Sequence, residues 1–478
     1  MARRKIYLIS ALVLVITAIF SAGYLHPDEH FQIIEFAGLK LHLTEKMNLP
    51  WEFHQQMRPA IQPFMVVVIF RFFSLFGTPD PFFVAFILRL LTALVSFLGM
   101  WSIYKVNEKE IGHDLLKKWF LFLSFFLWFV LFINVRFTSE TWSGSVFLIA
   151  FAFLQHKQPR TRLRDYFLTG ILLGLSFLFR YQSGILVLGM GLWLLLVRKA
   201  AIYRMLMLFS GIILVFFTGL MLDRWFYGEW TVTAWNYLQQ NIIFDKVSGF
   251  GIQPWWFYIR STFYEGIPPF SLVYIAAVLL FLTFKRKDIL TWTLFPFLTI
   301  HFLIGHKEMR FLFPILGFLP LIIIQSTDLV RQKWVPGLLE FKAIKYLAKI
   351  FWGANLVMLL AIAVSPVDNE IRIFQTIYRN YPAPTTLYFI KEDPYRRALD
   401  IYFYKRKNLR IEKVDSVGQI NIIPGRTSLF VVRTNPETEG LKLRKKLIYS
   451  SYPDWFKYFN FNHWIERTHL WYVYELEK

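Results

Sequence analysis

A series of long apolar runs between residues 6 and 365 constrains this chain more than any other feature. Many of them are roughly 17–23 residues long, enough for a helix to cross a bilayer core of about 30 Å. Hydrophobic residues make up 56% of the 478 residues, against about 45–50% in soluble domains. The sequence therefore predicts a polytopic helical membrane protein. The apolar runs lie at 6–25, 59–77, 82–104, 119–134, 142–156, 166–182, 183–197, 204–222, 268–284, 288–304, 311–328 and 346–365.

The net charge of +21 is carried largely by short loops between these runs. Basic loops of membrane proteins usually lie in the cytoplasm, against anionic headgroups. We find no nucleic-acid-binding module and expect no nucleic-acid partner. The basic connections occur at 2–5, 156–164, 198–204, 285–287 and 331–345. Placing them inside leaves loops 26–58, 223–267 and 305–310 on the opposite, outer face, together with the C-terminal segment.

The stretch 119–156 does not fit simple alternation of crossings. It has to cross once overall, yet two short apolar pieces flank NVRFTSET at 134–141. We expect one crossing plus a broken or re-entrant segment, since irregular backbone is tolerated at membrane depth where protein or a wet cavity covers it. This gives about 11 crossings, each of bilayer length.

The composition becomes that of a soluble domain after Pro366. Short strands are predicted at 385–390, 409–414, 427–434 and 469–476, and an amphipathic helix at 393–406. The predicted organisation is a transmembrane domain over 1–365 and a small outer-face α/β domain over 366–478. With no Cys in the chain, disulfides, thiolate metal sites and Cys nucleophiles are excluded.

The outer segment HPDEHFQ, at 26–32, places His26, Asp28, Glu29 and His30 close together. One interpretation is a helix start, with Pro27 at the first helical position and the acids in the first turn. The string also fits the zinc-peptidase pattern H-x-x-E-H. However, a helix that begins at Pro27 would put His26 at the cap and not on the helical face. A third interpretation is a carboxylate general base held at the membrane surface.

A second outer segment, GHKEMRF at 305–311, is dense in charge. His306, Lys307 and Arg310 surround Glu308. Lys and Arg commonly extend to the interface from helix ends. The pattern also suits a phosphate, because Lys supplies a point charge and Arg a fork of donors.

Arg136 and Arg180 add cations within or near the apolar zone, where an Arg usually faces a polar interior. Arg71 and Arg89 are placed toward the other face, and for these two we expect structural roles. Acids, cations and abundant Trp and Tyr on one outer face together indicate group transfer from a lipid-linked phosphate.

The same segments, in order, resemble glycosyltransferase family 22, which comprises the ALG-type and GPI mannosyltransferases of the GT-C fold. The matching strings are HPDEHFQ with Glu35, WEF…MRPAIQP, LDRWFYGEWTVTAWNYLQQN, QPWWFYIRS and HKEMRFLFPILGFLPL. The HPDE-x-x-Q form is closest to the GPI third- and fourth-mannose branch, and a bacterial relative is an alternative. The likeness covers roughly 20–325. It departs at VRFTSET, where Glu140 replaces the usual Asn, and at WEF and PWWFY.

The resemblance implies transfer of a hexose, most simply mannose, from polyprenyl-phosphate sugar to a sugar hydroxyl of a lipid-linked or envelope glycan, with inversion to an α-linkage. Asp28 would act as general base, with Glu29 as runner-up or acceptor-orienting carboxylate. The donor phosphate would be bound by His306, Lys307, Arg310, Arg180 and Arg136. The substrate groove would include His26, Gln32, Glu35, Arg58, Tyr227, Trp235 and Asn236, although Tyr227, Trp235 and Asn236 equally suit a role in folding their loop.

The family needs no nucleotide, and no metal or other cofactor is implied. The expected partners are the polyprenyl-phosphate donor, a glycan or glycolipid acceptor and membrane lipid. The active site would lie on the non-cytoplasmic face, toward the periplasm or outside of a bacterial inner membrane, or alternatively toward the endoplasmic reticulum lumen.

Two other classes fit parts of the sequence. A transporter or flippase of lipid-linked sugars would place ionisable groups near the midplane, often on broken helices in matched halves. No repeat is visible here, and the acids follow the first apolar run. A membrane zinc peptidase would need a further Glu ligand on a helix, and the nearest candidates, Glu108 and Glu110, fall in an expected loop.

Overall fold

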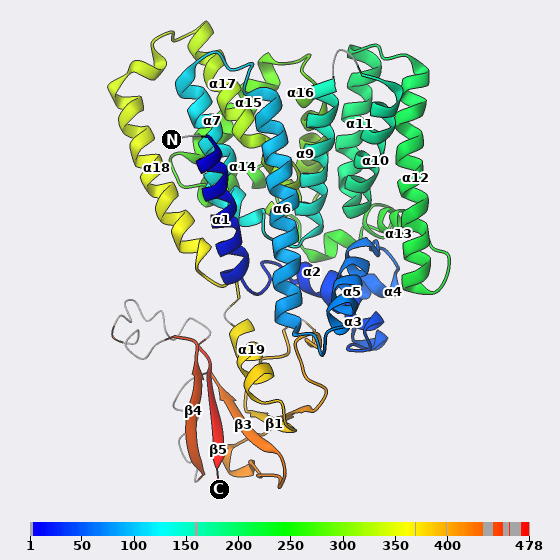
Figure 1. Cartoon of the computed structure of the whole chain (residues 1–478), viewed down its shortest axis with the longest axis vertical. Coiled ribbons are helices and arrows are strands. Elements are labelled where there is room, and N and C mark those ends of the chain that lie inside the picture. The colour runs from blue at the N-terminus through cyan, green and yellow to red at the C-terminus, as the bar shows by residue number, and fades with distance from the viewer. Residues whose placement is uncertain are drawn as a thin grey trace. The chain divides into compact units, whose positions relative to one another are not determined.

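A computed structural model describes residues 3–157, 161–368, 370–397, 399–433, 443–452, 458 and 470–477 (Figure 1). The chain divides into two compact units. The first, the helical unit, comprises Met1–Ser21, Gln55–Met65 and Phe86–Ser365. The second, the mixed unit, comprises Ala22–His54, Val66–Ala85 and Pro366–Lys478. The basic loop predicted at 156–164 lies partly outside the described residues, at 158–160.

Helices make up nearly all of the regular structure before residue 365. Within the described residues, five stretches are long and apolar enough to cross a membrane: Pro81–Asn107, Asp114–Ile133, Ile202–Tyr227, Met309–Lys333 and Lys342–Ala363. Four shorter apolar helices lie at Ile61–Ser74, Tyr181–Val197, Ser271–Phe284 and Ile289–Leu303. The predicted multi-pass helical membrane bundle is confirmed, while the number of crossings stays a prediction.

The longer helices of this part are α1 (Arg3–Phe20), α5 (Ile61–Ser74), α6 (Pro81–Asn107), α7 (Asp114–Phe126), α8 (Trp128–Ile133), α9 (Ser139–Lys157), α10 (Leu163–Phe179), α11 (Gly184–Leu192), α12 (Ile202–Tyr227), α15 (Ser271–Phe284), α16 (Ile289–Leu303), α17 (Leu319–Lys333) and α18 (Lys342–Ala363). Shorter helices include α13 (Thr233–Leu238), α14 (Phe257–Glu265) and the 3₁₀ segment η7 (Met309–Phe318).

The stretch 119–156 is interrupted at the predicted polar segment, where residues 134–138 separate α8 from α9. A second interruption, which the sequence did not predict, lies at Leu127 between α7 and α8. Asn355 of α18 satisfies the freed backbone groups: its Oδ1 accepts from Trp128 N at 3.0 Å and its Nδ2 donates to Phe126 O at 2.8 Å. This buried amide replaces the missing helical bonds, so the irregular backbone is covered by protein, as membrane depth requires.

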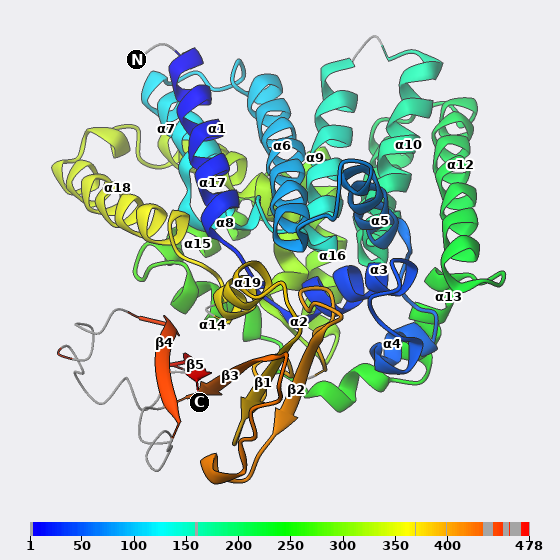
Figure 2. The same ribbon diagram turned by 60° about the horizontal axis from the view of Figure 1, so that its bottom comes forward.

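Helices α10 and α12 pack side by side through glycines (Figures 1 and 2). A Cβ on Gly170 would lie 2.0 Å from Leu208 O, and a Cβ on Gly211 would lie 2.3 Å from Phe167 O. Small residues allow membrane helices to approach until their backbones touch, and dispersion then holds them together. Any larger side chain at either position would force the two helices apart.

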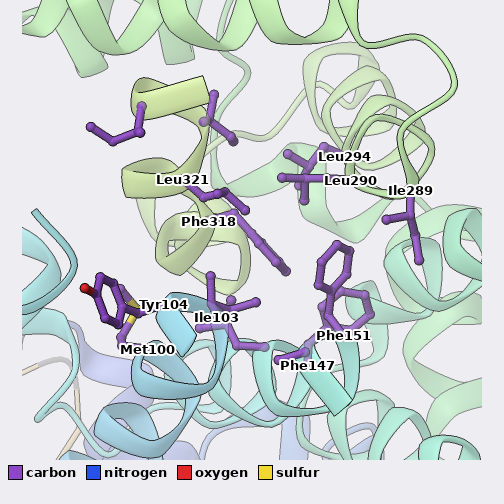
Figure 3. Packing of buried hydrophobic residues seen from close by; sticks show 14 of the residues in the cluster. Met100, Ile103, Tyr104, Phe147, Phe151, Ile289, Leu290, Leu294, Phe318 and Leu321 are labelled. Carbon is purple, nitrogen blue, oxygen red and sulfur yellow. The ribbon is translucent and has the colours of Figure 1, made fainter. Parts of the chain in front are cut away.

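The core of the helical unit is aromatic and aliphatic (Figure 3). Phe318 of η7 meets Phe151 of α9 edge to face, with ring centroids 4.9 Å apart. Gly144 of α9 lies against Pro314, whose Cα would be 2.7 Å from an added Cβ. This packing fixes η7, and therefore the charged loop that precedes it, against the start of α9.

The mixed unit contains a five-stranded sheet in the order β2-β1-β3-β5-β4 (Figure 2). Strand β1 pairs in parallel with β2 and β3, whereas β5 is antiparallel to β3 and β4. The four predicted strands form, apart from Thr434 and His469 at their ends, which lie outside the described residues. The strands are β1 (Thr385–Phe389), β2 (Leu409–Lys413), β3 (Thr427–Val432), β4 (Arg444–Ser450) and β5 (Tyr472–Glu477).

The amphipathic helix predicted at 393–406 is wrong. Residues 393–397 and 399–406 form turns and an isolated β-bridge. The backbone N–H groups of Tyr402 and Phe403 donate to the Glu35 carboxylate, so they do not form helical bonds. The amphipathic helix of this domain is instead α19 (Ile371–Asn380), whose buried side is Ile371, Ile373, Phe374 and Ile377.

Candidate active site

Residues 25–30 of the mixed unit are here called the acidic segment. They contain the three-residue helix α2 (Pro27–Glu29). His26 is its N-cap, as predicted, and its Nδ1 accepts from Asp28 N at 3.3 Å. Glu29 is buried, and its Oε2 accepts from Leu25 N at 2.9 Å. The Glu29 carboxylate therefore caps its own turn, an arrangement that the helix dipole favours.

Asp28 differs from Glu29 in accessibility. Its side chain is 23% exposed, and its carboxylate lies 3.6 Å from His26 Nδ1. A general base has to reach a substrate proton, so Asp28 suits that role better than the buried, backbone-bound Glu29. The zinc alternative requires both imidazoles on a helical face. Here His26 caps the helix and His30 Nε2 lies 2.9 Å from Glu35 Oε1.

Glu35, predicted to line the substrate groove, is 1% exposed and begins α3 (Glu35–Lys40). Its Oε1 accepts from Tyr402 N at 2.8 Å and Phe403 N at 3.0 Å, while Thr44 Oγ1 donates to its Oε2. Burial raises its pKa, but the bonds to His30, Phe403 and Thr44 outweigh burial, so the pKa lies below its usual value. The geometry makes Glu35 an ionised internal anchor.

Gln32, in the π-helical turn η1 (His30–Ile34), donates from Nε2 to Glu52 Oε1 at 2.8 Å. Glu52 is 9% exposed and lies in α4 (Trp51–His54). Glu52 is the central residue of the WEF string and was not predicted as a site residue. A buried acid 20 residues from its partner gives no local spacing signal.

The second group of charges lies in the helical unit and is called the cationic cluster. Glu308 sits at its centre: Arg310 Nε donates to Glu308 Oε2 at 2.6 Å and Arg310 Nη2 to Oε1 at 3.1 Å. Glu140, the residue that departs from the family motif, is shared by Arg180 at 3.1 Å and Arg310 at 3.4 Å. Besides these four residues, the cluster contains His306 and Lys307.

The sequence separated Arg180 and Arg310 by 130 positions, and the fold brings both to one carboxylate. Arg180 is the C-cap of α10, where Arg180 Nη1 also donates to Ser139 Oγ at 3.2 Å. The cluster thus contains three permanent cations, Arg180, Lys307 and Arg310, and two carboxylates, a composition that suits an anionic ligand.

Lys307 is the most buried cation of the HKEMRF segment, at 4% exposed. Its Nζ donates to the carbonyl oxygens of Gln253, at 3.1 Å, and Ile304. Among the residues that the structure describes, no carboxylate lies within 4.0 Å of it. Burial lowers its pKa. An anion that replaced water here would interact with Lys307 at low dielectric and therefore strongly.

Both ring nitrogens of His306 face acceptors. Nδ1 lies 3.0 Å from Gly251 O and Nε2 lies 2.9 Å from Glu308 Oε1. The Gly251 carbonyl and the Glu308 carboxylate thus orient the His306 ring.

Arg136 lies at the end of α1. It is fully buried, and its Nη1 donates to Ser21 O at 2.6 Å. Arg89 Nε donates likewise to Ala18 O at 2.8 Å, a contact that suits the predicted structural role, although it lies at the end of α1 that leads into loop 26–58 and not toward the other face as predicted. Both guanidinium groups hold the last carbonyl groups of α1, and the phosphate-binding role of Arg136 stays a prediction.

The loop residues expected in the substrate groove form a hydrogen-bonded junction. Tyr227 OH donates to Arg58 O at 2.8 Å, and Asn236 Nδ2 donates to Gln56 O at 3.1 Å. The Arg58 guanidinium lies 5.6 Å from the Tyr237 ring centroid. Trp235 is instead 56% exposed. The contacts of Tyr227 and Asn236 are those that a role in folding their loop requires, Trp235 presents an aromatic face, and the place of all three in the substrate groove stays a prediction.

Comparisons with known proteins agree with this picture. The Alg9-like mannosyltransferase family matches residues 5–404. Mannosyltransferase APTG1 of Arabidopsis thaliana is 25% identical over 342 residues, which are 70% of this chain and 60% of that protein. GPI alpha-1,2-mannosyltransferase 3 of Xenopus laevis is 27% identical over 305 residues, 61% of this chain and 54% of that protein. The chain thus spans less than two thirds of the length of these relatives.

Solved structures show the same fold. ArnT from Cupriavidus metallidurans bound to undecaprenyl phosphate has a TM-score of 0.54 at 13% identity, over 98% of this chain and 97% of that one. The apo form has a TM-score of 0.51 at 12% identity over the same shares. At this identity the likeness shows the fold alone, and it confirms the GT-C architecture expected from the sequence.

Proposed function

Because the chain belongs to the Alg9-like mannosyltransferase family, we propose that it is a membrane glycosyltransferase that uses a polyprenyl-phosphate sugar, with mannose as the sugar. The observation that carries the proposal is the cationic cluster, where the fold brings Arg180, Arg310 and His306 to the carboxylates Glu140 and Glu308, with the buried Lys307 beside His306 in the chain. A phosphate leaving group requires such donors, because negative charge develops on it as the sugar departs.

The acceptor hydroxyl supplies the nucleophile in this scheme. Asp28 takes the hydroxyl proton while the oxygen bonds to the sugar C1 on the face opposite the phosphate. The C1–O bond to phosphate breaks, and its electron pair leaves with polyprenyl phosphate. Attack from the opposite face inverts the anomeric centre and yields an α-linkage from a β-linked donor. No second acid is required, since a phosphate is already a good leaving group.

The comparisons support the proposed donor and acceptor. The ArnT structure holds undecaprenyl phosphate, which supports a polyprenyl phosphate as the carrier. Relatives named as GPI alpha-1,2-mannosyltransferases support a glycolipid acceptor. We place the reaction on the non-cytoplasmic face, because the basic loops favour the cytoplasm and the acidic segment follows α1 on the other side.

The test is release of polyprenyl phosphate by purified protein supplied with synthetic polyprenyl-phosphate mannose and glycolipid acceptors. We expect elongated acceptor in equal amount to released carrier. Lys307→Ala should raise the KM for donor about tenfold or more, since a charge-assisted hydrogen bond is lost, whereas the exposed Lys287→Ala should leave it unchanged. Absence of sugar transfer with every donor, together with lipid-sugar flux in liposomes, would overturn the proposal in favour of a transporter.

A further inference from the structure

The acidic segment is held at its upstream end by the start of the C-terminal domain. Val367 N donates to Ala22 O at 2.9 Å. Gly23 has φ +95°, and a Cβ there would lie 2.4 Å from Asp368 Cβ. This positive φ and this close approach require glycine. The backbone just before the acidic segment therefore lies directly against residue 368.

An ion network with two buried carboxylates stabilises that junction. Arg397 donates to Asp368 at 2.9 Å and to Glu370 at 2.6 Å. The Arg397 guanidinium also lies 5.9 Å from the Tyr24 ring centroid. Trp471 Nε1, at the start of the last strand, donates to Glu370 at 3.2 Å. Three separate parts of the C-terminal domain thus meet beside Tyr24.

The downstream end of the acidic segment is held by a different part of the same domain. His30 is stacked between Tyr24 and Tyr404, with each pair of ring centroids 5.4 Å apart. Tyr404 in turn stacks on Phe82 at 4.7 Å. Glu35 receives the backbone N–H groups of residues 402 and 403. The family match ends at residue 404, directly after these contacts.

We propose that the C-terminal domain positions the general base by holding the chain on both sides of it, at residues 22–24 before the acidic segment and at residues 30–35 at its end and beyond. This inference rests on the proposed function, in which Asp28 is the base. Asp28 lies in the first turn of a continuous helical stretch, in which α2 runs directly into η1 and α3, and the ends of helices fray unless other contacts hold them. Catalytic groups need supports that fix them to about 0.5 Å, and these two sets of contacts supply such support.

The test combines backbone hydrogen exchange with steady-state kinetics on the full chain in detergent. Tyr404→Ala removes the stack on His30, and Gly23→Ala separates residue 23 from Asp368. We expect amide exchange in residues 27–35 to rise about tenfold in each variant, as expected when aromatic or close packing contacts are lost. We also expect kcat to fall about tenfold or more while the KM for donor changes less than twofold. Tyr404→Phe, which keeps the ring, should restore both.

Arg433→Ala is the matched control, because Arg433 pairs with Glu392 elsewhere in the domain and should change neither readout. Unchanged exchange at 27–35 in both Gly23→Ala and Tyr404→Ala, with native helix content, would overturn the clamp even if the enzyme is active. If the wild-type protein transfers no sugar and the two variants still show raised exchange, the result would support the clamp and count against the proposed function. If one variant does not fold, the other decides, since they act at opposite ends of the segment.

Discussion

The cationic cluster and the acidic segment hold their charges by different means. In the cluster, Arg180 and Arg310 are held by other charges, namely Glu140 and Glu308. In the acidic segment, Glu29 accepts from the backbone N–H of Leu25, and His30 is stacked on Tyr24 and Tyr404 as well as in contact with Glu35. Side chains held mainly by one another's charge respond to a change in local anions, whereas backbone bonds and ring stacking add supports that do not depend on charge. The first arrangement suits a ligand that comes and goes, and the second suits a fixed base.

The largest effect is expected from Asp28→Asn. The substitution keeps the shape but removes the base, so turnover should fall about 10²–10⁴-fold while binding of polyprenyl phosphate is unchanged. Initial-rate kinetics and a direct binding assay measure the two effects. Asp114→Asn, at a side chain 91% exposed, should behave as wild type. Near-normal turnover of Asp28→Asn would remove Asp28 from the mechanism.

Glu140→Gln tests whether Arg180 and Arg310 are held in place by their shared carboxylate. Arg180 and Arg310 lose a shared buried counter-ion, and breaking such a pair destabilises by about 3 kcal/mol. Thermal unfolding in detergent measures the loss, and the exposed Glu340→Gln is the control. Polyprenyl phosphate should raise the Tm more in the variant than in wild type, because the ligand binds the native state and replaces the lost anion. An equal ligand-induced shift in both proteins would contradict phosphate binding in this cluster.

A pH series addresses the Glu35 anchor. Its folded-state pKa is lowered from 4.5, so it contributes stability above pH 4.5 that is lost as the pH falls through the lower folded value. Glu35→Gln should be less stable by about 1–3 kcal/mol at pH 7, because buried N–H donors lose a charged partner. Its Tm should also depend less on pH below 4.5. The exposed Glu45→Gln should keep the wild-type profile, and a profile of Glu35→Gln that is as steep as wild type would contradict the role of Glu35.

The smallest effect is expected from Tyr227→Phe. This change removes one hydrogen bond, from Tyr227 OH to Arg58 O, worth about 1 kcal/mol of stability. Turnover should stay within about twofold of wild type if the residue only folds its loop. Thermal unfolding and initial rates decide the matter together. A loss of turnover above tenfold would indicate that Tyr227 contacts the substrate.

The membrane bundle and its family were predictable from local signals. Apolar runs have the length of a bilayer crossing, and the break between α8 and α9, at residues 134–138, was indicated by the polar stretch NVRFTSET, whereas the break at Leu127 was not. The start of α2 at Pro27 followed from the preference of proline for the first helical position. Four of the five strands described in the C-terminal domain likewise followed from their composition, whereas β4 was not predicted.

The sequence failed where a residue's partner is distant. The helix expected at 393–406 has an amphipathic pattern, yet Glu35 takes its N–H groups at a separation of 367 and 368 positions. Glu52 was overlooked because its partner Gln32 gives no periodic signal. Glu140 was noticed only as a departure from a motif, and its contact with two arginines arises from helices that meet in three dimensions.

The sequence by itself determined that the chain is a multi-pass membrane protein, which family it belongs to and which polar segments interrupt the apolar runs, because each of these depends on residues close together in the chain. Only the tertiary structure decided which carboxylate is partly exposed and which is buried. Asp28 and Glu29 are neighbours with the same charge, yet one is partly exposed and the other is buried against Leu25 N. Burial and hydrogen-bond partners are set by packing, and packing joins residues that the sequence keeps apart.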